Sequence, residues 1–327
     1  YMGFAHLCRS RGVAFAGRTV LILGTGGTHN TAAAVARDEG AARVLTASRR
    51  PDPSKGWISY KEAVRSGAQV VINTTPAGMY PDVGQCLLDV AAMPGLEAVV
   101  DVVYNPARTE LLLRAEEAGV PVTACGLEML VAQAVWAAEY FLDKPFADRE
   151  GEICRSAADL RRDILNVSLV GMPSSGKTTL GRALAAALGR PFVDLDEEIV
   201  RADGRSIPEI FAAEGEDGFR ARETEQVRRF GKESGLLISC GGGVVTRPEN
   251  VRALRQNGLV LFVDRPLEAL AVGGGRPLSS SPEALRAMEA ERRPLYEKAA
   301  DAVIRNDGTA EDAAARALQA LDELFAQ

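Results

Sequence analysis

Short apolar runs alternate with longer amphipathic stretches along most of the chain. Five runs rich in Val, Ile and Leu occur at residues 18–24, 43–48, 69–75, 97–104 and 120–126, and five more at 166–171, 191–196, 236–240, 259–264 and 300–305. Continuous apolar runs are typical of buried parallel strands, and the stretches between them are long enough for right-handed helical crossovers. The pattern therefore predicts an α/β protein with two doubly wound parallel sheets in series.

A charged stretch, DREGEICRSAADLRRDIL at 148–165, interrupts this rhythm between the two series. It predicts a helical connector and divides the 327 residues into two domains of ordinary size. We expect a first domain at 1–150, a connector at 151–165 and a second domain at 166–327.

Composition narrows the classes of function. Hydrophobic residues make up 46% and charged residues 25%, and the net charge is -6. An acidic chain has no global field that attracts nucleic acid or anionic lipid, and no apolar run approaches the ~20 residues that span a bilayer. The five cysteines show no CxxC spacing, which argues against a disulfide framework or a zinc site. We expect a cytoplasmic protein with neither nucleic acid nor membrane as a partner.

The strongest motif is VSLVGMPSSGKTTLGRALA, which predicts a strand, a GxxxxGK[ST] loop and a helix. In such a loop backbone N–H groups surround the phosphates of ATP, Lys177 contacts the β- and γ-phosphates, and Thr178 coordinates Mg²⁺. The predicted ATP-binding residues are Gly171, Ser174, Ser175, Gly176, Lys177, Thr178 and Thr179.

Two acidic residues end the next apolar run, FVDLDEEI. Ligands bind at the carboxyl edge of open α/β sheets, and strand alternation would place Asp194 and Asp196 on one side. One carboxylate would then hold Mg²⁺ through its hydration shell, and the other would receive an acceptor hydroxyl. The alternative is an acidic start of the following helix.

Further along, GFRARETE contains Arg220, Arg222 and Glu223, CGGGVV contains Gly241 to Gly243, and ERRPLYEKAA contains Arg292 and Arg293. These arginines could be solvated helix residues. Two of them converging on one pocket would instead bind a carboxylate in a bidentate manner.

Together VGMPSSGKTTLG, VDLDEEI, IFAAEGEDGFRARE, CGGGVV, GGGRPL and ERRPLY resemble the shikimate kinase family over about residues 166–326. The resemblance implies phosphorylation of the 3-hydroxyl of shikimate by ATP and Mg²⁺ on a nucleoside-monophosphate-kinase-like core. It implies that Asp196 acts as the base and that Asp194 binds Mg²⁺ through water. It also implies that Glu223 orients Arg220 and that Arg276 closes over the transferring phosphate. The residues that it implies for shikimate binding are Arg220, Arg292, Gly241, Gly242 and Gly243.

One segment departs from that family. Where an adenine-stacking arginine usually precedes RPL, this chain has Ala271 and Val272 followed by three glycines. The alternatives are therefore a kinase for another small hydroxy compound, such as gluconate, and a nucleotide-binding remnant or scaffold without turnover.

In the first domain LILGTGGTHNTAAAVA places Gly24, Gly26 and Gly27 at a strand-to-helix turn. Glycine there allows a pyrophosphate to approach the helix N-terminus. The next strand ends in ASRR rather than in a carboxylate, so Arg49 and Arg50 favour the 2'-phosphate of NADP over the free ribose of NAD. We expect Ser48 and Arg49 to be cofactor-binding residues. The alternative is a solvated basic turn.

The segments GTGGTHNTA, ASRR, NTTPAGM, DVVYNPARTELL and GLEMLVAQAVWAAE resemble the cofactor-binding half of shikimate dehydrogenase over about residues 1–145. The resemblance implies a cofactor cleft lined by Asn73, Thr74 and Thr75, nicotinamide contacts from Gly126 and Met129, and substrate contacts from Tyr104 and Gln133. In that family a substrate domain with the catalytic lysine precedes a segment like Tyr1 to Phe4. We therefore expect a longer multifunctional polypeptide, of which this part binds NADP without efficient dehydrogenase activity.

Overall fold

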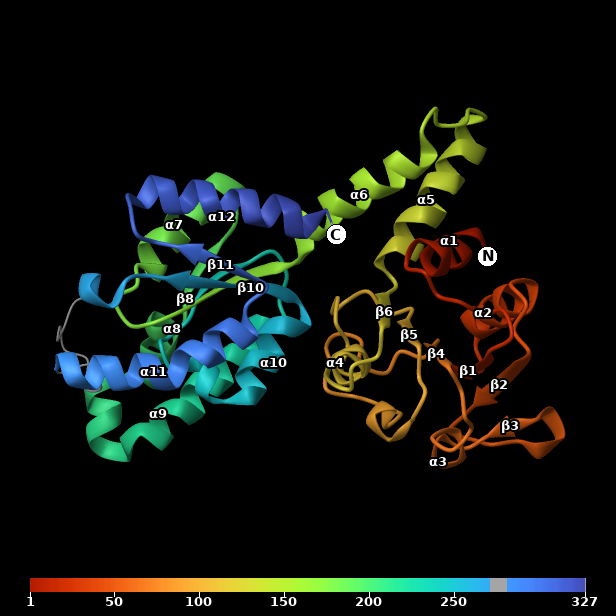
Figure 1. Cartoon of the computed structure of the whole chain (residues 1–327), viewed down its shortest axis with the longest axis horizontal. Coiled ribbons are helices and arrows are strands. Elements are labelled where there is room, and N and C mark those ends of the chain that lie inside the picture. The colour runs from red at the N-terminus through yellow and green to blue at the C-terminus, as the bar shows by residue number, and fades with distance from the viewer. Residues whose placement is uncertain (271–280, 327) are drawn as a thin grey trace. The chain divides into compact units, whose positions relative to one another are not determined.

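The computed structural model describes residues 1–270 and 281–326, which form two compact units, Tyr1–Ala158 and Asp159–Gln327. Figure 1 shows a parallel sheet with flanking helices in each unit. Both sheets confirm the predicted fold class. Arg49, the predicted 2'-phosphate ligand, belongs to the first unit, and the described kinase candidates belong to the second.

The first sheet has six parallel strands in the order β3-β2-β1-β4-β5-β6. Its strands are β1 (Thr19–Leu23), β2 (Arg43–Ala47), β3 (Trp57–Ile58), β4 (Val70–Asn73), β5 (Ala98–Asp101) and β6 (Val122–Cys125). Its helices are α1 (Met2–Ser10), α2 (Gly27–Asp38), α3 (Tyr60–Ala63), α4 (Glu110–Glu117) and α5 (Leu127–Leu142), with 3-10 turns η1 (Pro53–Lys55) and η2 (Val90–Ala92). The two-residue strand β3 was not predicted.

Alternating residues of each strand build two hydrophobic layers. Val20 and Ile22 of β1 face α1 and α2, whereas Leu21 and Leu23 face α3 and α4. All four side chains are completely buried. Because both faces are covered, successive positions in the middle of a strand such as β1 are apolar, which is why the sequence shows runs rather than alternation.

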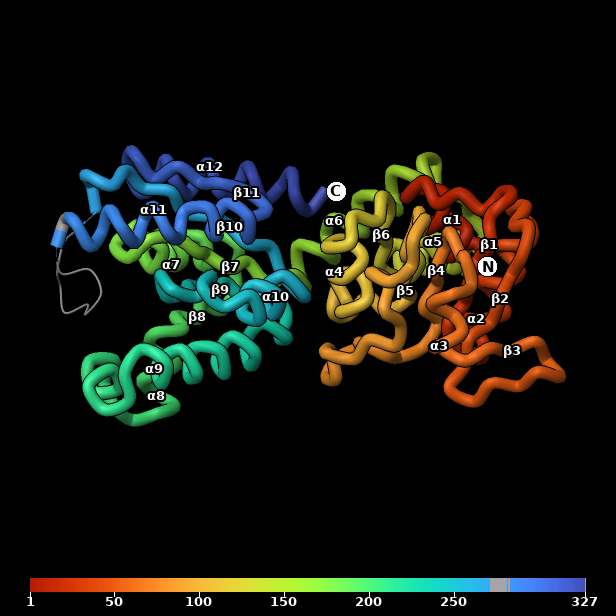
Figure 2. Tube along the Cα trace, turned by 60° about the horizontal axis from the view of Figure 1, so that its bottom comes forward, coloured from red at the N-terminus to blue at the C-terminus, as the bar shows by residue number. Residues whose placement is uncertain are grey.

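The second sheet has five parallel strands in the order β11-β10-β7-β9-β8. They are β7 (Asn166–Val170), β8 (Phe192–Asp194), β9 (Leu237–Ser239), β10 (Gly258–Asp264) and β11 (Ala302–Arg305). The helices are α7 (Lys177–Leu188), α8 (Leu195–Asp203), α9 (Ile207–Gly231), α10 (Pro248–Gln256), α11 (Pro282–Ala299) and α12 (Ala310–Phe325), with 3-10 turns η3 (Val244–Thr246) and η4 (Leu267–Ala269). Figure 2 follows the same elements as a tube.

Helices cover both faces of this second sheet. Leu169 and Leu237 lie against Gly181 of α7, while Val170 and Ile238 pack in the core with α10 and α11. In Figure 1 α7 and α12 lie on one side of the strands and α9, α10 and α11 on the other. The carboxyl ends of the strands are left for the loops that carry polar residues.

The helix α6 (Arg149–Ile164) occupies the charged stretch between the two series of strands, and the division between the units falls inside it. Ile153 and Ala157 are its buried residues. Within residues 1–270 and 281–326, no helix is long and apolar enough to cross a membrane.

A buried carboxylate ties two strand ends together in the first unit. Asp101, which is completely buried at the end of β5, accepts hydrogen bonds from the Asn73 side-chain amide (2.9 Å), the Val103 backbone N–H (3.0 Å) and the Thr109 hydroxyl (2.7 Å). Burial raises the pKa of Asp101 to about 6, although the hydrogen bonds act in the opposite direction.

This raised pKa predicts a pH effect on folding. Because the folded state holds the proton more tightly than the unfolded state, the Asp101 contribution to stability is present below about pH 4 and is lost as the pH rises through 6. In Asp101→Asn this loss should be absent, so the variant should gain about 2 kcal/mol relative to the parent between pH 4 and pH 7.

Urea unfolding followed by tryptophan fluorescence measures this effect, because Trp57 and Trp136, the two tryptophans of the chain, both lie in the first unit. A difference between variant and parent that stays constant from pH 4 to pH 7 would contradict the assignment.

Candidate functional site

The phosphate-binding loop connects β7 to α7 and forms one wall of a pocket of about 570 Å³ in the second unit. Ser174, Gly176, Lys177, Thr178 and Thr179 line this pocket. Gly171 directly follows the strand at the base of the loop, and the Ser175 side chain is completely buried. The structure thus brings most of the predicted ATP-binding residues to one cavity.

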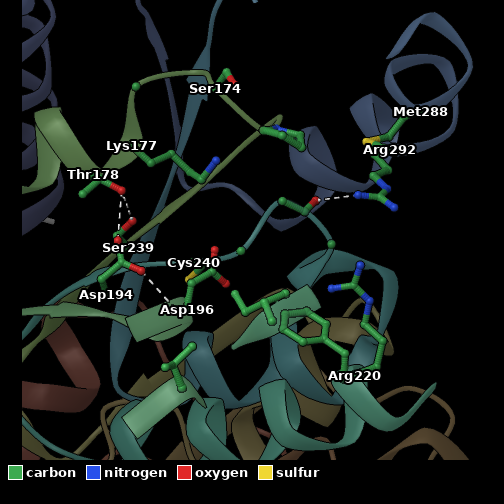
Figure 3. Close-up of a pocket in the computed structure, with 18 of the residues that line it drawn as sticks. Ser174, Lys177, Thr178, Asp194, Asp196, Arg220, Ser239, Cys240, Met288 and Arg292 are labelled. Carbon is green, nitrogen blue, oxygen red and sulfur yellow. Dashed lines mark hydrogen bonds between the residues drawn. The ribbon is translucent and has the colours of Figure 1, made fainter. Parts of the chain in front are cut away.

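Lys177 is folded back onto its own loop. Its Nζ donates to the backbone carbonyls of Gly171 (2.9 Å) and Met172 (2.8 Å), and its side chain is buried. These carbonyls hold the ammonium group at the phosphate end of the pocket, where Figure 3 shows it. Such a buried cation is prepared for an anionic ligand.

Asp194 and Asp196 both line the pocket, although not by strand alternation. Strand β8 ends at Asp194, which is the N-cap of α8 and accepts from the Asp196 backbone N–H (3.0 Å), so Asp196 lies in the first helical turn. The other Asp194 oxygen accepts from the Thr178 hydroxyl (2.9 Å). The capping interpretation is therefore also right, and one carboxylate combines a cap with a contact to the phosphate loop.

Two buried arginines reach the opposite wall from different helices (Figure 3). Arg220 of α9 forms ion pairs with Glu223 (2.9 Å) and Glu216 (3.0 Å). Arg292 of α11 donates to the Gly242 carbonyl (3.2 Å), and its Nε is buried without a hydrogen-bond partner in the described structure. Two guanidinium groups with spare donors at one cavity suit a carboxylate ligand.

Glu223 is completely buried beneath Arg220. Burial raises the pKa of Glu223, while the adjacent Arg220 opposes that rise. Burial alone would lower the pKa of Arg220, but the ion pairs with Glu223 and Glu216 together outweigh this effect and the pKa is raised. The pair therefore keeps the Arg220 guanidinium charged and fixed at the pocket wall.

The other predicted arginines are engaged elsewhere. Arg222 pairs with Asp203 and Glu214, and Arg293 pairs with Asp264 (2.6 Å) as well as with glutamates of its own helix. Neither lines the pocket. Arg276, together with Ala271 and Val272, lies outside the described residues.

The glycine loop 241–243 follows β9 and allows charged groups to approach its backbone. A Cβ on Gly243 would collide with the Arg220 guanidinium, and one on Gly241 would lie 2.7 Å from Glu223 Oε1 and 3.0 Å from Asp196 Oδ1. Side chains at these positions would displace the groups that line the pocket. Gly241 and Gly243 therefore need to be glycines for these charged groups to lie where they do.

Tyr296 was not among the predicted site residues. Its ring is completely buried and stacks on Phe262 with centroids 5.1 Å apart, and its hydroxyl donates to the Gly242 carbonyl. Gly242 therefore accepts from both Arg292 and Tyr296, one turn apart on α11. The motif RRPLY could have indicated this contact, because Arg292 and Tyr296 are four positions apart and therefore share a helix face.

In the first unit, the ends of three neighbouring strands meet. Gly24 N–H donates to Ala47 O (2.9 Å) and Thr74 N–H to Leu23 O (3.0 Å). Gly24 has φ +99°, and a Cβ there would lie 2.7 Å from the Thr75 side chain, so glycine is required by both conformation and space. Gly26 and Gly27 have open space in front of them, as a ligand at the start of α2 would need.

A smaller pocket of about 350 Å³ lies at this edge and is lined by Thr74, Thr75 and Tyr104, among others. Asn73 lies behind it, where its side-chain carbonyl accepts from the Thr75 N–H (3.0 Å) and hydroxyl (2.7 Å). Gly126 N–H donates to Val103 O (3.1 Å), directly behind the pocket wall.

The remaining first-unit candidates lie outside this pocket. Ser48 accepts from the Arg50 N–H (3.2 Å), and Arg49 is exposed beyond the end of β2. Met129 and Gln133 lie on α5 beside Gly3 of α1, and Gln133 is exposed.

Fold and site define the second unit as a P-loop phosphotransferase. The family model "Shikimate kinase" matches residues 173–322. The shikimate kinase of Symbiobacterium thermophilum is 46% identical over 169 residues, which cover 49% of this chain and 97% of that protein. That of Synechococcus sp. is 44% identical over 165 residues, covering 48% and 82%. Through its second unit, the chain belongs to the shikimate kinase family.

Solved structures are similar to each half. Shikimate kinase from Acinetobacter baumannii in complex with shikimate is 38% identical, with a TM-score of 0.47, and covers 50% of this chain and 95% of that one. A chorismate mutase/shikimate 5-dehydrogenase fusion protein from Clostridium acetobutylicum is 29% identical, with a TM-score of 0.44, covering 47% and 59%. The chain thus spans about 59% of the length of that fusion protein.

The Tyr296 hydroxyl provides a first test of the site. Removing it in Tyr296→Phe leaves the Gly242 carbonyl with Arg292 alone, and a hydrogen bond contributes about 1 kcal/mol. We expect kcat/KM for the acceptor substrate to fall about fivefold, with KM for ATP unchanged. The control is Tyr140→Phe, because Tyr140 is 84% exposed on α5. A lower melting temperature with unchanged kcat/KM would contradict a positioning role.

Proposed function

We propose that the second unit transfers the γ-phosphoryl group of ATP to the 3-hydroxyl of shikimate. The observation that carries this proposal is a single pocket lined by a phosphate-loop lysine, two acidic residues and two buried arginines. One end of the pocket suits phosphates and the other suits a carboxylate. A small acid with hydroxyl groups bound between them would present a hydroxyl to the phosphoryl group.

Mg²⁺ fits this pocket as an ion shared between protein and nucleotide. Thr178 and Asp194, already joined by a hydrogen bond, are the residues that would hold it. When bound, the ion neutralises phosphate charge. No cluster of three or more His, Cys, Asp or Glu side chains among the described residues could hold a metal, which agrees with the preference of Mg²⁺ for one or two carboxylates plus phosphates.

The chain's own residues would bind the phosphates, bind shikimate and accept the proton. Lys177 would move from its loop carbonyls to the β- and γ-phosphates, and the loop N–H groups would surround them. Arg220 and Arg292, with the backbone of the glycine loop, would bind the shikimate carboxylate and ring hydroxyls. Asp196 would accept the proton of the reacting hydroxyl. Catalysis would then rest on positioning and charge neutralisation.

An ADP-release assay coupled to NADH oxidation tests this function, with quinate and gluconate as alternative acceptors. We predict turnover that depends on shikimate and Mg²⁺. Faster turnover with gluconate would favour the kinase for another hydroxy compound, and nucleotide binding without ADP release would favour the remnant or scaffold.

Substitution of Arg220 tests the carboxylate site. Lysine keeps the charge but loses the paired donors, so Arg220→Lys should raise KM for shikimate at least tenfold and leave KM for ATP unchanged. Arg222→Lys is the matched control, because Arg222 lies two positions away on α9 and pairs with Asp203 and Glu214. Equal KM values in the two variants would refute the assignment.

We propose NADP binding for the first unit, at the strand ends that carry Gly24, Thr74 and Thr75. Of the described residues that line its pocket, Tyr80 and Tyr104 alone have ionisable side chains, so we propose binding rather than hydride transfer for this chain. The domain limits 1–150 and 166–327 are part of the same proposal.

The charge of Arg49 should decide cofactor choice. Arg49→Ala should weaken NADPH binding about tenfold, because it removes a cation from the 2'-phosphate, and should leave NADH binding unchanged. Arg43→Ala, at the other end of β2, is the control. Titration by cofactor fluorescence measures both, and an equal loss for NADPH and NADH would contradict the assignment.

A further inference from the structure

Arg265 lies on the side of the phosphate-binding loop that faces away from the arginine and glycine wall. It directly follows β10, which pairs with β7 on one side and β11 on the other, whereas the glycine loop follows β9 on the opposite side of β7. The loop after β7 is therefore flanked by the acceptor site on one side and by the ends of β10 and β11 on the other.

The Arg265 guanidinium lies close to the last glycine of the phosphate loop. Its Nη1 is 3.8 Å from the position that a Cβ on Gly176 would occupy, and the Asn306 amide is 2.6 Å from the same position. Asn306 donates to the Ser175 carbonyl (2.7 Å) and its N–H to the Asp264 carbonyl (2.7 Å). Asn306 thus fixes the loop against the strand ends, with Arg265 beside it.

The neighbouring carboxylates are already occupied by other arginines. Asp264 pairs with Arg293 (2.6 Å) and Asp307 with Arg316 (2.6 Å). Arg265 forms no ion pair or hydrogen bond with any residue in 1–270 or 281–326, and its Nε is buried without an acceptor. A guanidinium whose buried donor lacks an acceptor is costly, and an anionic ligand would relieve that cost.

Arg292 gives a useful comparison on the other side of the loop. Its Nε is likewise buried without an acceptor, and it lines the pocket assigned to the acceptor substrate. Since the loop N–H groups and Lys177 take the β- and γ-phosphates, an anion next to Gly176 on the β10 side corresponds to the phosphate nearest the nucleoside.

We propose that Arg265 binds the α-phosphate of the nucleotide in the kinase reaction. This inference rests on the proposed phosphoryl transfer and adds a nucleotide contact from outside the GxxxxGK[ST] motif. The residue that follows β10 would thus supply a cationic contact on the nucleoside side of the phosphate chain.

Calorimetric titration of ADP and AMP into the full chain tests this contact, alongside KM values for ATP and shikimate. Arg265→Ala should raise Kd for both nucleotides about tenfold and KM for ATP similarly, while KM for shikimate stays unchanged and reports an intact fold. Arg265→Lys should retain part of the affinity, because a phosphate accepts a point charge. Arg305→Ala, an exposed arginine at the end of β11, is the matched control and should bind ADP normally.

Normal ADP and AMP affinity in Arg265→Ala would overturn the inference. A second result would also overturn it: a changed ratio of ATP to GTP turnover, together with nucleotide binding by Arg265→Lys that is as weak as binding by Arg265→Ala. This result would place the guanidinium on the nucleobase. If the parent chain neither binds ADP nor phosphorylates shikimate, the proposed kinase function itself is wrong. This result differs from a failure of the Arg265 contact, in which the parent chain is active and Arg265→Ala binds nucleotides normally.

Discussion

The site in each unit depends on one constraint, which is that all strands of a parallel sheet end at the same edge. In the second unit this edge gathers the phosphate loop after β7, Asp194 at the end of β8, the glycine loop after β9 and Arg265 after β10. These residues are far apart in the sequence, and no helix alone could bring them together. Because the polar residues lie at this edge, the hydrophobic faces of the sheet remain covered by helices and the core keeps its apolar contacts.

Within the second unit, the phosphate loop separates two regions of positive charge. Arg220 and Arg292 line the pocket beside the glycine loop that follows β9, and Arg265 lies on the side of β10 and β11. Buried cations are tolerated where partners or ligands compensate for lost hydration, and Glu223 does so for Arg220. Two anionic ligands bound on opposite sides of the loop would thus each contact a cation. This arrangement would favour one orientation of each ligand.

The sequence was sufficient for both sheets because their strands are buried on both faces and appear as uninterrupted apolar runs. It was not sufficient for β3, whose two residues, Trp57 and Ile58, are too short to give a pattern. The motifs located Lys177 and Asp194, since local geometry places them. The contact from Tyr296 to Gly242 spans 54 positions. That Arg265 has no ion-pair partner within 1–270 and 281–326 depends on which neighbours have already paired. Neither feature can be seen in a linear pattern.

The most direct test of the account is to identify the product formed from ATP, Mg²⁺ and shikimate by this chain. A ¹H–³¹P correlation NMR spectrum distinguishes phosphate esters at the three ring hydroxyls, because it identifies the ring proton that couples to the phosphorus. We predict shikimate 3-phosphate in equal amount to ADP. ADP released without a phosphorylated ring, or phosphate at another hydroxyl, would contradict the placement of the acceptor between Asp196 and the two arginines.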